Sequence, residues 1–570
     1  MKNLEIAKIL NTIADILELQ EVQFKPQAYR KAALAIESLA EDIEAVSARG
    51  ELQEIPGIGE HIAAKIEEYI QTGKVKYYHD LKKEVNIDIE HLLEIPSLGP
   101  KKIKVLHQKL GVRNLADLER AIQRHKLLTI PGFGEETEKN LLKGIELVRS
   151  RPKRFLHAQV LPLVNSILAT FKKYPFVETI EIAGSFRRGK ETVGDLDFLV
   201  ISNHPEKVTT AFTTMPDVKE ILAQGPTRSS VLLHNGLQID LRVLQKKEWG
   251  SALLYFIGSK EHNVELRKLA LSKGYTLSEY GLFRLKNKQW VAGRTEQEIY
   301  HKLGIKQYIQ PELRENNGEI KAAQNRKLPY LMTVKDVKGV FHNHSTWSDG
   351  TASLLDMATK AEELGFKFVS FNDHYGPVGI TNPLNEKRLI QYRKEIDKVQ
   401  KKVGLKVFSG VEIDILKDGT LPLSKAILKQ LDVVVASIHV ALKMSETEMT
   451  KRVCSVLEQY PVNILGHPTD RLLNVREPLP LNLDQVFETA RQHRVFMEIN
   501  ASPSRCDLAG EQVKAALQAG CQFALSTDAH AVNGLEHYPL GVLMARRGWL
   551  ENQKVLNCWE LPKIEKALQK

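Results

Sequence analysis

The stretch IEIAGSFRRGKETVGDLDFLVIS, residues 180–202, decides how the front half of this chain folds. One apolar run ends at Gly184-Ser185, and a second apolar run follows it. The pattern predicts a strand, a tight turn into a helix, and a second strand. A Gly-Ser pair at the start of a helix presents backbone amides and a hydroxyl to a phosphate. Arg187 and Arg188 add positive charge beside that turn.

Three aspartates are expected to lie close to this turn. Asp195 and Asp197 open the second run, and their spacing of two puts both carboxylates on one face of a strand. In GLQIDLRVL, residues 236–244, apolar residues alternate with polar ones, so Asp240 faces away from the core. Such carboxylates repel one another unless cations lie between them. Two Mg²⁺ ions held there would bind a triphosphate and activate a 3′-hydroxyl. A D-x-D pair alone is common at solvated strand ends, but the third aspartate and the Gly-Ser turn favour a catalytic site.

Residues 1–150 have helical periodicity and repeat one phrase three times. The copies are LQEIPGIGEHIAAKIEEYI, LLEIPSLGPKKIKVLHQKL and LLTIPGFGEETEKNLLKGI, with cores at 55–59, 95–99 and 130–134. Each phrase predicts a helix-hairpin-helix, in which glycines let a nucleic-acid backbone approach unpaired amides at a helix N-terminus. An ordinary turn between helices is the alternative, which three copies make harder to sustain. The expected DNA-contacting glycines are Gly57, Gly59, Gly99, Gly132 and Gly134.

Composition indicates several globular domains, since the chain has 570 residues of which 43% are hydrophobic. Residues 337–570 carry 29 Lys and Arg against 27 Asp and Glu, so most of the net charge of +10 falls in the front half. A basic front half suits a polyanionic partner. The sequence has no run of 18 apolar residues, so it predicts no membrane span. The N-terminal residues predict an amphipathic helix rather than a secretory signal. Four cysteines without a C-x-x-C pair favour reduced thiols in the cytoplasm.

The second half repeats a different pattern seven times, in which an apolar run ends at a residue able to bind a metal. Regular alternation of strands and helices predicts a parallel α/β unit, and in a closed parallel barrel the C-terminal strand ends meet on one face. Mixed imidazoles and carboxylates suit Zn²⁺, Mn²⁺ or Fe²⁺. Nine ligands exceed the shell of one ion, so two or three ions are expected, with Glu412 as the bridge. The nine are His342, His344, Asp349, His374, Glu412, His439, His467, Asp528 and His530.

The front-half motifs resemble the nucleotidyltransferase signature of family X DNA polymerases, the polymerase beta superfamily. KPQAYRKAA, residues 25–33, is similar to the family's lyase-domain helix, and LYFIGSKEHNVELRKLALSKGY, residues 254–275, is similar to its thumb. The resemblance implies that Asp195, Asp197 and Asp240 hold two Mg²⁺ ions and that Asp240 assists deprotonation of the primer hydroxyl. It implies three further groups around the nucleotide. These are Gly184, Ser185, Arg188 and Gly194 for the triphosphate, Tyr255, Phe256 and Gly258 for the sugar, and Asn263 and Arg267 for the nascent base pair and template.

Three positions qualify this resemblance. Gln238 stands where the vertebrate enzymes have an arginine, and Lys260 stands where they have an aspartate near the incoming base. Lys65 matches the family's Schiff-base lysine. Lyase chemistry needs an amine made nucleophilic by its surroundings, and a surface lysine that contacts phosphate is the alternative, so 5′-deoxyribose-phosphate lyase activity stays open.

The histidine-rich half resembles the PHP domain (polymerase and histidinol phosphatase), a distorted seven-stranded β/α barrel, with all nine ligand positions filled. A polymerase core followed by a PHP domain is the arrangement of bacterial and archaeal family X polymerases. The expected fold is therefore multidomain: an α-helical helix-hairpin-helix region, an α/β nucleotidyltransferase palm with a thumb, and a distorted (β/α)7 PHP barrel. The expected boundaries are 1–82 for a lyase-like domain, 83–150 for fingers, 151–243 for the palm, 244–316 for the thumb, 317–336 for a linker and 337–570 for the PHP domain.

This arrangement predicts a repair enzyme that fills short gaps by template-directed synthesis. The PHP domain is expected to be a Mn²⁺- or Zn²⁺-dependent 3′→5′ exonuclease, with abasic-site or 3′-end processing as a further activity. The expected partners are gapped or recessed duplex DNA and dNTPs, with no membrane, and we expect a cytoplasmic, nucleoid-associated monomer. Two alternatives remain: a template-independent transferase with phosphatase activity, and a DNA-end-binding scaffold with vestigial sites. The hairpins and Arg267 argue against the first, and the intact carboxylates and ligands argue against the second.

Overall fold

The computed structural model describes residues 2–37, 43–55, 57–93, 95, 98–150, 154–377 and 381–570. Pro56, Pro96 and Ser97 of the repeated phrases lie outside the described residues, as do the first residues of the expected palm, 151–153. The chain divides into two compact units, Met1–Pro152 with Asp349–Thr351, and Lys153–Ser348 with Ala352–Lys570. Each unit is described by itself below.

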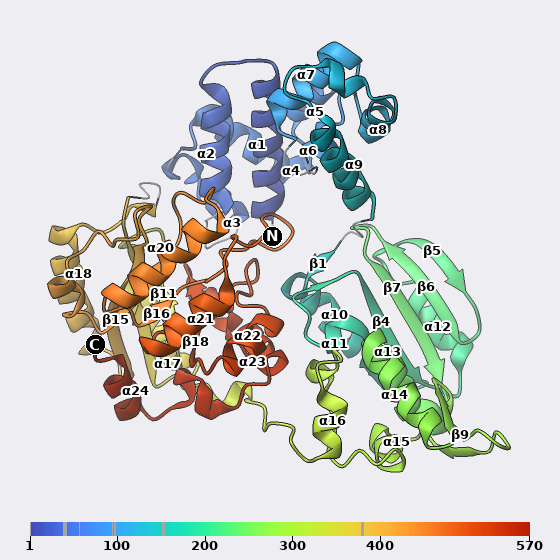
Figure 1. Cartoon of the computed structure of the whole chain (residues 1–570). Helices are drawn as coiled ribbons and strands as arrows, with labels where there is room; N and C mark the ends of the chain where they lie inside the picture. Colours follow the sequence, from blue (N-terminus) through green and yellow to red (C-terminus); the bar gives the residue numbers. More distant parts are fainter. Residues whose placement is uncertain are drawn as a thin grey trace. The chain divides into compact units, whose positions relative to one another are not determined.

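Residues 1–150 are helical throughout their described part, as the periodicity predicts (Figure 1). Their buried apolar residues form one core, which includes Leu10, Ile13 and Leu17 of the first helix. The elements are α1 (Lys2–Leu19), α2 (Lys25–Glu37), α3 (Ile43–Ala48), η1 (Leu52–Glu54), α4 (Glu60–Thr72), α5 (Lys76–Val85), α6 (Ile89–Leu93), α7 (Pro100–Leu110), α8 (Leu115–Gln123), η2 (Lys126–Thr129) and α9 (Glu135–Ser150).

In each repeated phrase a short helix or 3₁₀ turn is followed, a few residues later, by a longer helix. Gly59 and Gly99 are the N-caps of α4 and α7, and Gly134 immediately precedes α9. Gly57 and Gly132 have φ of +93° and +89°, a left-handed conformation that favours glycine. The helix-hairpin-helix prediction is therefore correct in its local geometry.

The second unit begins with a five-stranded sheet in the order β2-β4-β7-β6-β5. All strand pairs are antiparallel except β4 with β7, which run parallel. The strands are β2 (Thr179–Ile182), β4 (Asp195–Ile201), β5 (Val218–Gln224), β6 (Arg228–Leu233) and β7 (Gln238–Leu244), with a small pair β1 (Phe155–Leu156) and β3 (Thr192–Val193). The helices are α10 (His157–Phe171), the single turn α11 (Gly184–Arg187), α12 (Pro205–Thr213), η3 (Lys246–Glu248) and α13 (Trp249–Ile257).

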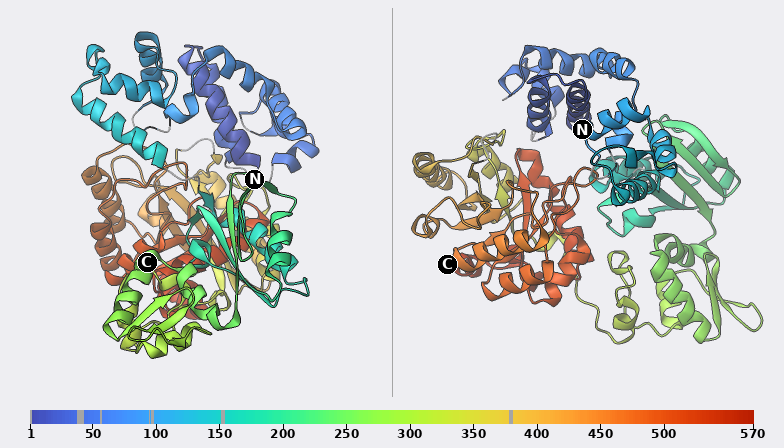
Figure 2. Two further views of the ribbon diagram at one scale, coloured as in Figure 1. Left: turned by 90° about the vertical axis from the view of Figure 1, so that its right-hand side faces the viewer. Right: turned by 45° about the horizontal axis from the view of Figure 1, so that its top comes forward.

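Helices cover both faces of this sheet (Figures 1 and 2). On one face, Leu196 and Phe198 pack with residues of α10 and α12. On the other face, Leu199 and Leu244 pack against α13. Because side chains alternate along a strand, Asp195 and Asp197 share the face of Leu199.

A smaller α/β region follows, with its own core around Leu266, Tyr300 and Leu313. Its elements are α14 (Lys260–Ser272), β8 (Tyr275–Ser278), β9 (Gly281–Arg284), β10 (Trp290–Ala292), α15 (Glu296–Lys302), η4 (Pro311–Leu313), α16 (Glu319–Gln324) and η5 (Val334–Asp336). The three strands form an antiparallel sheet in the order β10-β9-β8.

From residue 339 the chain forms a closed parallel barrel. β12 and β13 pair successively with β14, so eight named strands fill seven positions, and β11 closes the ring by pairing with both β12 and β18. The strands are β11 (Gly339–Asn343), β12 (Phe368–Phe371), β13 (His374–Tyr375), β14 (Lys406–Asp414), β15 (Val433–Ser437), β16 (Ile464–Leu465), β17 (Phe496–Asn500) and β18 (Phe523–Ala529). The predicted seven-stranded barrel is confirmed.

Helices surround the barrel (Figure 1). They are α17 (Leu354–Glu363), α18 (Glu386–Gln400), α19 (Lys425–Leu428), α20 (Glu446–Gln459), α21 (Leu483–Gln492), α22 (Gly510–Gln518), α23 (Tyr538–Arg547) and α24 (Leu561–Leu568), with 3₁₀ turns η7 (Val532–His537), η8 (Asn552–Lys554) and η9 (Leu556–Cys558). Phe341, Phe368 and Phe408 fill the interior and pack with Ile564 and Leu568 of α24. The N-terminal end of the barrel is therefore filled by apolar side chains.

Among the described helices, none has the length and apolar character needed to cross a membrane. All four cysteines are free thiols, as their spacing predicts.

Candidate active sites

The three aspartates of the palm converge at the start of the parallel strand pair. Asp197 of β4 lies opposite Asp240 of β7, and Asp195 lies opposite Gln238. Ser230 donates a hydrogen bond to Oδ1 of Asp240, and the amide of Gln238 donates one to Oδ2 at 2.7 Å. Gln238, which stands where an arginine is expected in the vertebrate enzymes, therefore fixes the orientation of the third carboxylate.

The three carboxylates lie close together, so their negative charges repel one another. Burial raises the pKa of Asp197 to about 7, and the charges of Asp195 and Asp240 contribute to that rise. Burial and the charge of Asp240 also raise the pKa of Asp195. Burial and like charges oppose the ionisation of these carboxylates. Their oxygens, on adjacent strands, therefore fit hard divalent cations such as Mg²⁺.

The Gly184-Ser185 turn approaches these carboxylates closely. Gly184 has φ of +62°, and a Cβ added there would lie 2.5 Å from Oδ2 of Asp197. Only glycine permits this distance between the α11 turn and β4. Arg188 ends the turn, where its Nε donates to Glu315 at 3.1 Å and its Nη1 donates to the carbonyl of Ile257. Gly194 lies beside Arg154, whose Nη1 would be 3.7 Å from an added Cβ.

The residues expected around the sugar and base lie on α13 and at the start of α14. Tyr255, Asn263 and Arg267 line one small pocket. The side-chain amide of Asn263 donates to the carbonyl of Tyr255 at 2.7 Å, and Phe256 stacks under the guanidinium of Arg242 at 4.6 Å. Gly258 caps α13 with φ of +74°. A Cβ added at Gly258 would lie 3.1 Å from Nη1 of Arg188, so the end of α13 lies next to the turn beside the aspartates.

The hairpin glycines and Lys65 lie in the helical unit. No described side chain lies within 4 Å of a Cβ added at Gly59, Gly99, Gly132 or Gly134, whereas Gly57 lies against Lys31. Lys65 of α4 donates to the carbonyl of His61 at 2.9 Å, and its Nζ lies 4.8 Å from the ring centre of Tyr77. Burial, chiefly, and the nearby charge of Lys25 lower the pKa of Lys65.

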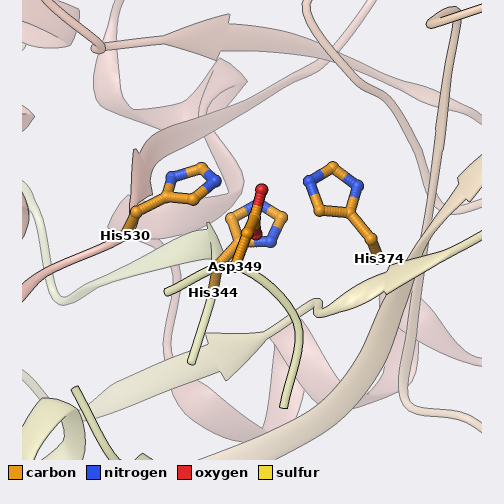
Figure 3. A group of neighbouring side chains, drawn as sticks. All are labelled: His344, Asp349, His374 and His530. Carbon is orange, nitrogen blue, oxygen red and sulfur yellow. The ribbon is translucent and has the colours of Figure 1, made fainter. Parts of the chain in front are cut away.

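All nine residues predicted in the barrel gather at the C-terminal ends of its strands. Glu412 is central, since its carboxylate lies 2.9–3.6 Å from a ring nitrogen of each of five histidines: His342, His344, His374, His439 and His467. Asp528 lies 3.3 Å from Nε2 of His344. Potential ligand atoms of His344, Asp349, His374 and His530 lie within 4.8 Å of one another, and Figure 3 shows these side chains facing a common centre.

Backbone irregularities turn several of these side chains toward the common site at the C-terminal ends of the strands. His342, His467 and Asp528 have φ of +55°, +22° and +50°. The pairing of β11 with β18 shifts register between Phe341 and Asn343, next to His342. Simple alternation would place His342 with Val340, which packs outside the barrel, so the shift re-aims the imidazole. Strained backbone of this kind is typical of functional sites.

Two carboxylates lie behind the histidines and are not among the nine predicted ligands, although Glu498 ends one of the seven apolar runs. Asp414 accepts a hydrogen bond from Nδ1 of His439 at 2.7 Å, and Glu498 accepts one from Nδ1 of His342 at 2.7 Å. Carboxylates in this position fix the orientation and basicity of metal-binding histidines. A signal existed for Asp414, because it follows Glu412 by two residues in β14 and so shares its face.

In this site the charges of neighbouring side chains shift pKa values in the direction opposite to that of burial. Burial alone would lower the pKa of His342, but the carboxylates of Glu412 and Glu498 outweigh it and raise that pKa well above its usual value. Burial alone would raise the pKa of Glu412, but His342, His439 and His374 hold it well below its usual range. Buried imidazoles converging on one carboxylate, two of them backed by hydrogen-bonded carboxylates, fit a centre of several divalent ions.

Comparison with known proteins agrees with this geometry. Family models match the chain as a helix-hairpin-helix domain (residues 1–75), a SAM-like helix-hairpin-helix tandem (89–146), the DNA polymerase beta palm (157–251), the DNA polymerase beta thumb (252–315) and a PHP domain (341–502). The DNA polymerase/3′-5′ exonuclease PolX of Bacillus subtilis (strain 168) is 34% identical over 574 residues, which cover 100% of both chains. The chain belongs to the family X DNA polymerases that carry a PHP domain.

More distant relatives match separate halves. DNA polymerase lambda of Rattus norvegicus is 27% identical over 335 residues, 53% of this chain and 55% of that protein. A probable phosphatase of Thermoanaerobacter sp. (strain X514) is 26% identical over 241 residues, 40% of this chain and 93% of that protein. The two resemblances that the sequence suggested are thus both confirmed at the level of family.

Proposed function

We propose that this protein is a DNA-directed DNA polymerase that fills short gaps in repair, and that its barrel is a metal-dependent 3′→5′ exonuclease. The observation that carries the proposal is the presence of two ligand sets in one chain, three carboxylates on the β4–β7 pair and nine residues of which Glu412 is the centre. A relative that matches the whole chain is named as both a polymerase and a 3′-5′ exonuclease.

In the polymerase site, Asp195, Asp197 and Asp240 would hold two Mg²⁺ ions. When bound, such ions neutralise the charge of the triphosphate and make the primer hydroxyl a better nucleophile. Asp240 is oriented by Gln238 and Ser230, so one of its oxygens can accept the proton of that hydroxyl.

The remaining residues of this site would position the nucleotide. Gly184, Ser185, Arg188 and Gly194 would bind the triphosphate through backbone amides, a hydroxyl and a guanidinium. Tyr255, Phe256 and Gly258 would contact the sugar, and Asn263 and Arg267 would face the base pair and template. Positioning of this kind is a large part of the catalysis of phosphoryl transfer.

In the barrel, the nine ligands would hold two or three Mn²⁺ or Zn²⁺ ions, with Glu412 shared between them. When bound, these ions lower the pKa of water and hold the non-bridging oxygens of a phosphodiester. Asp414 and Glu498 keep the imidazoles in the tautomer and orientation needed for binding. The same chemistry would serve abasic-site or 3′-end processing.

The helical unit would grip the DNA backbone. The glycine turns at α4, α7 and α9 leave space next to helix N-termini, where amides can bind phosphates irrespective of sequence. We assign gapped or recessed duplex DNA and dNTPs as substrates of a cytoplasmic, nucleoid-associated monomer.

A lyase activity at Lys65 is a second candidate, favoured by the lowered pKa of its amine. Borohydride reduction in the presence of a 5′-deoxyribose-phosphate end should trap the wild-type protein on DNA, and Lys65→Ala should not be trapped. Lys31→Ala is the control, because Lys31 lies beside Gly57 of the same hairpin. Trapping of Lys31→Ala at the wild-type level would show that the effect is specific to Lys65. Trapping of Lys65→Ala at the wild-type level would exclude this assignment.

Single-site variants test the main proposal on gapped duplex. Asp195→Ala and Asp240→Ala should abolish extension at saturating Mg²⁺ and dNTP yet retain digestion of a 3′-labelled strand, because each substitution removes a ligand from one site only. His344→Ala and His439→Ala should give the reverse result. Substantial extension by either aspartate variant would refute the polymerase assignment, and loss of both activities in all variants would favour a scaffold whose sites are not separable.

A further inference from the structure

The segment that follows the Gly-Ser turn, residues 187–191, contacts the barrel within the second compact unit. Lys190 forms an ion pair with Glu511 at 3.2 Å, and Glu191 forms one with Arg471 at 3.1 Å. A Cβ added at Gly189 would lie 3.2 Å from the side chain of Leu543. The turn assigned to the triphosphate thus continues directly into an interface with the other catalytic domain.

Arg547 of α23 makes the most buried contact of this interface, since 2% of its side chain is exposed. Its Nη1 donates to Oε1 of Glu315 and to the backbone carbonyl of Arg188, both at 3.1 Å. The same oxygen of Glu315 accepts a hydrogen bond from Nε of Arg188, also at 3.1 Å. Nζ of Lys190 lies 3.4 Å from the second oxygen. One carboxylate therefore joins two cations of the palm to a cation of the barrel.

Glu315 is held in place by the residue before it. Arg314 is fully buried, donates to Glu296 at 2.6 Å and donates twice to the carbonyl of Ile309. The carbonyl of Arg314 accepts a hydrogen bond from the backbone of Ser259 at 3.0 Å. Because Arg314 is anchored through both its side chain and its carbonyl, the carboxylate of Glu315 next to it is a fixed point against which Arg188 is oriented.

The orientation of Arg188 is therefore determined by its partners. Nε is bonded to Glu315 and Nη1 to the carbonyl of Ile257, so among the described residues Nη2 is the nitrogen left for a ligand. Burial alone would raise the pKa of Glu315, but Arg547, Lys190 and Arg188 outweigh it and lower that pKa. An ionised Glu315 holds Arg188 in this orientation, and Arg547 supplies a compensating positive charge.

We propose that Arg547 is a positioning residue for nucleotide binding, so that the affinity of the polymerase site for dNTP depends on a side chain of the PHP domain. Arg547 fixes the backbone of the triphosphate turn through the carbonyl of Arg188 and offsets the charge of Glu315. The proposal rests on the assignment of Arg188 to the triphosphate. It predicts a coupling in one direction, since Arg547 does not belong to the nine ligands of the nuclease.

The test compares full-length variants in filling a single-nucleotide gap, with KM for dNTP and kcat measured separately. Arg547→Met should raise KM roughly tenfold or more, as expected for loss of a hydrogen-bonded charge, and change kcat less than twofold. Arg547→Lys, which retains the charge, should recover most of the affinity. Arg546→Met is the matched control, because Arg546 lies next in α23 and contacts Glu312 and the carbonyl of Met332 instead. Its KM should equal that of the wild type.

Exonuclease activity on a 3′-labelled strand shows whether the barrel of each variant is intact. If Arg547→Met loses exonuclease activity, Glu315→Ala provides the test instead, because Glu315 lies outside the barrel. Glu315→Ala should raise KM for dNTP, and an unchanged KM overturns the proposal. An equal rise in Arg546→Met would overturn it in favour of general domain docking. Arg188→Met distinguishes failure of the role of Arg547 from failure of the assignment of Arg188 to the triphosphate. A raised KM in Arg188→Met beside a normal KM in Arg547→Met refutes the role of Arg547 alone, whereas a normal KM in Arg188→Met removes the triphosphate assignment and this proposal with it.

Discussion

Replacement of Gly184 by alanine should disable synthesis by displacing Asp197. Two effects can be read from the structure. The positive φ of +62° costs an alanine roughly 1–2 kcal/mol. The added Cβ would also lie 2.5 Å from Oδ2 of Asp197. Relief of that contact to an ordinary distance moves the carboxylate by about 1 Å, and a displacement of that size at a catalytic group lowers rate on the order of 10²-fold.

The assay is kcat/KM for filling a single-nucleotide gap, with Gly274→Ala as the control. Gly274 has φ of +78°, but nothing described lies within 4 Å of its added Cβ, so its substitution imposes the same kind of backbone strain without a clash. We expect both variants to lose about the same stability and only Gly184→Ala to lose synthesis, with the nuclease intact. Calorimetry without nucleotide should show weakened Mg²⁺ binding by Gly184→Ala. If its kcat/KM stays within a few-fold of the control, the close approach of this turn to Asp197 has no catalytic role.

Three further outcomes are expected. Glu412→Gln should lower both the Mn²⁺ content and the nuclease rate, the latter by about 10²-fold, and leave gap filling near normal; a nuclease that persists with full metal content would place the reaction elsewhere. Because the pKa of Asp197 is raised to about 7, Mg²⁺ should displace roughly one proton at pH 6 and few at pH 8.5, which calorimetry in buffers of different ionisation enthalpy would reveal. Since the raised pKa favours protonated Asp197 in the folded state, the metal-free palm should lose stability as pH rises from 3.8 to about 7. Proton release on Mg²⁺ binding that increases with pH would contradict this. Affinity for gapped duplex should fall at least roughly tenfold between 50 and 200 mM salt, measured by fluorescence anisotropy, and a flat response would argue against phosphate contacts by the hairpins.

Local signals in the sequence were sufficient to predict the carboxylates and the glycine turns. Asp195 and Asp197 are two apart in a strand, and Asp240 alternates with buried Ile239 and Leu241, so period-two alternation alone places them on one face. In the helical unit, each glycine follows an apolar residue at a fixed spacing and precedes an amphipathic helix. These features depend on neighbours within a few residues, which a sequence displays directly.

Alternation was not sufficient in the barrel, where the backbone departs from regular strand geometry. His342 follows an inward-facing Phe341, and a regular strand would point the imidazole outward. The shifted register and positive φ at His342 bring it instead to within 3.2 Å of Glu412. That histidine was predicted from its residue type and its place at the strand end, but the bulge that makes the prediction correct leaves no pattern in the sequence.

The contacts around Arg547 are of a third kind, because nothing local indicates them. Arg188, Glu315 and Arg547 lie far apart along the chain, and each is an ordinary charged residue in its own segment. Their juxtaposition depends on how two folded domains pack within the second unit. Covariation between families of sequences could report such a triad, whereas the periodicity of one sequence cannot.

The two sites also differ in the chemistry by which they would discriminate metals. The palm offers carboxylate oxygens that repel one another, and burial opposes their ionisation, so an oxygen-preferring ion is favoured and binds in competition with protons. The barrel offers imidazole nitrogens that already surround an ionised Glu412, which favours Mn²⁺ or Zn²⁺ over Mg²⁺. Since neither ligand set resembles the other, one chain can keep synthesis and hydrolysis of the same phosphodiester under separate metal control, and a change in one set leaves the other chemically unaltered.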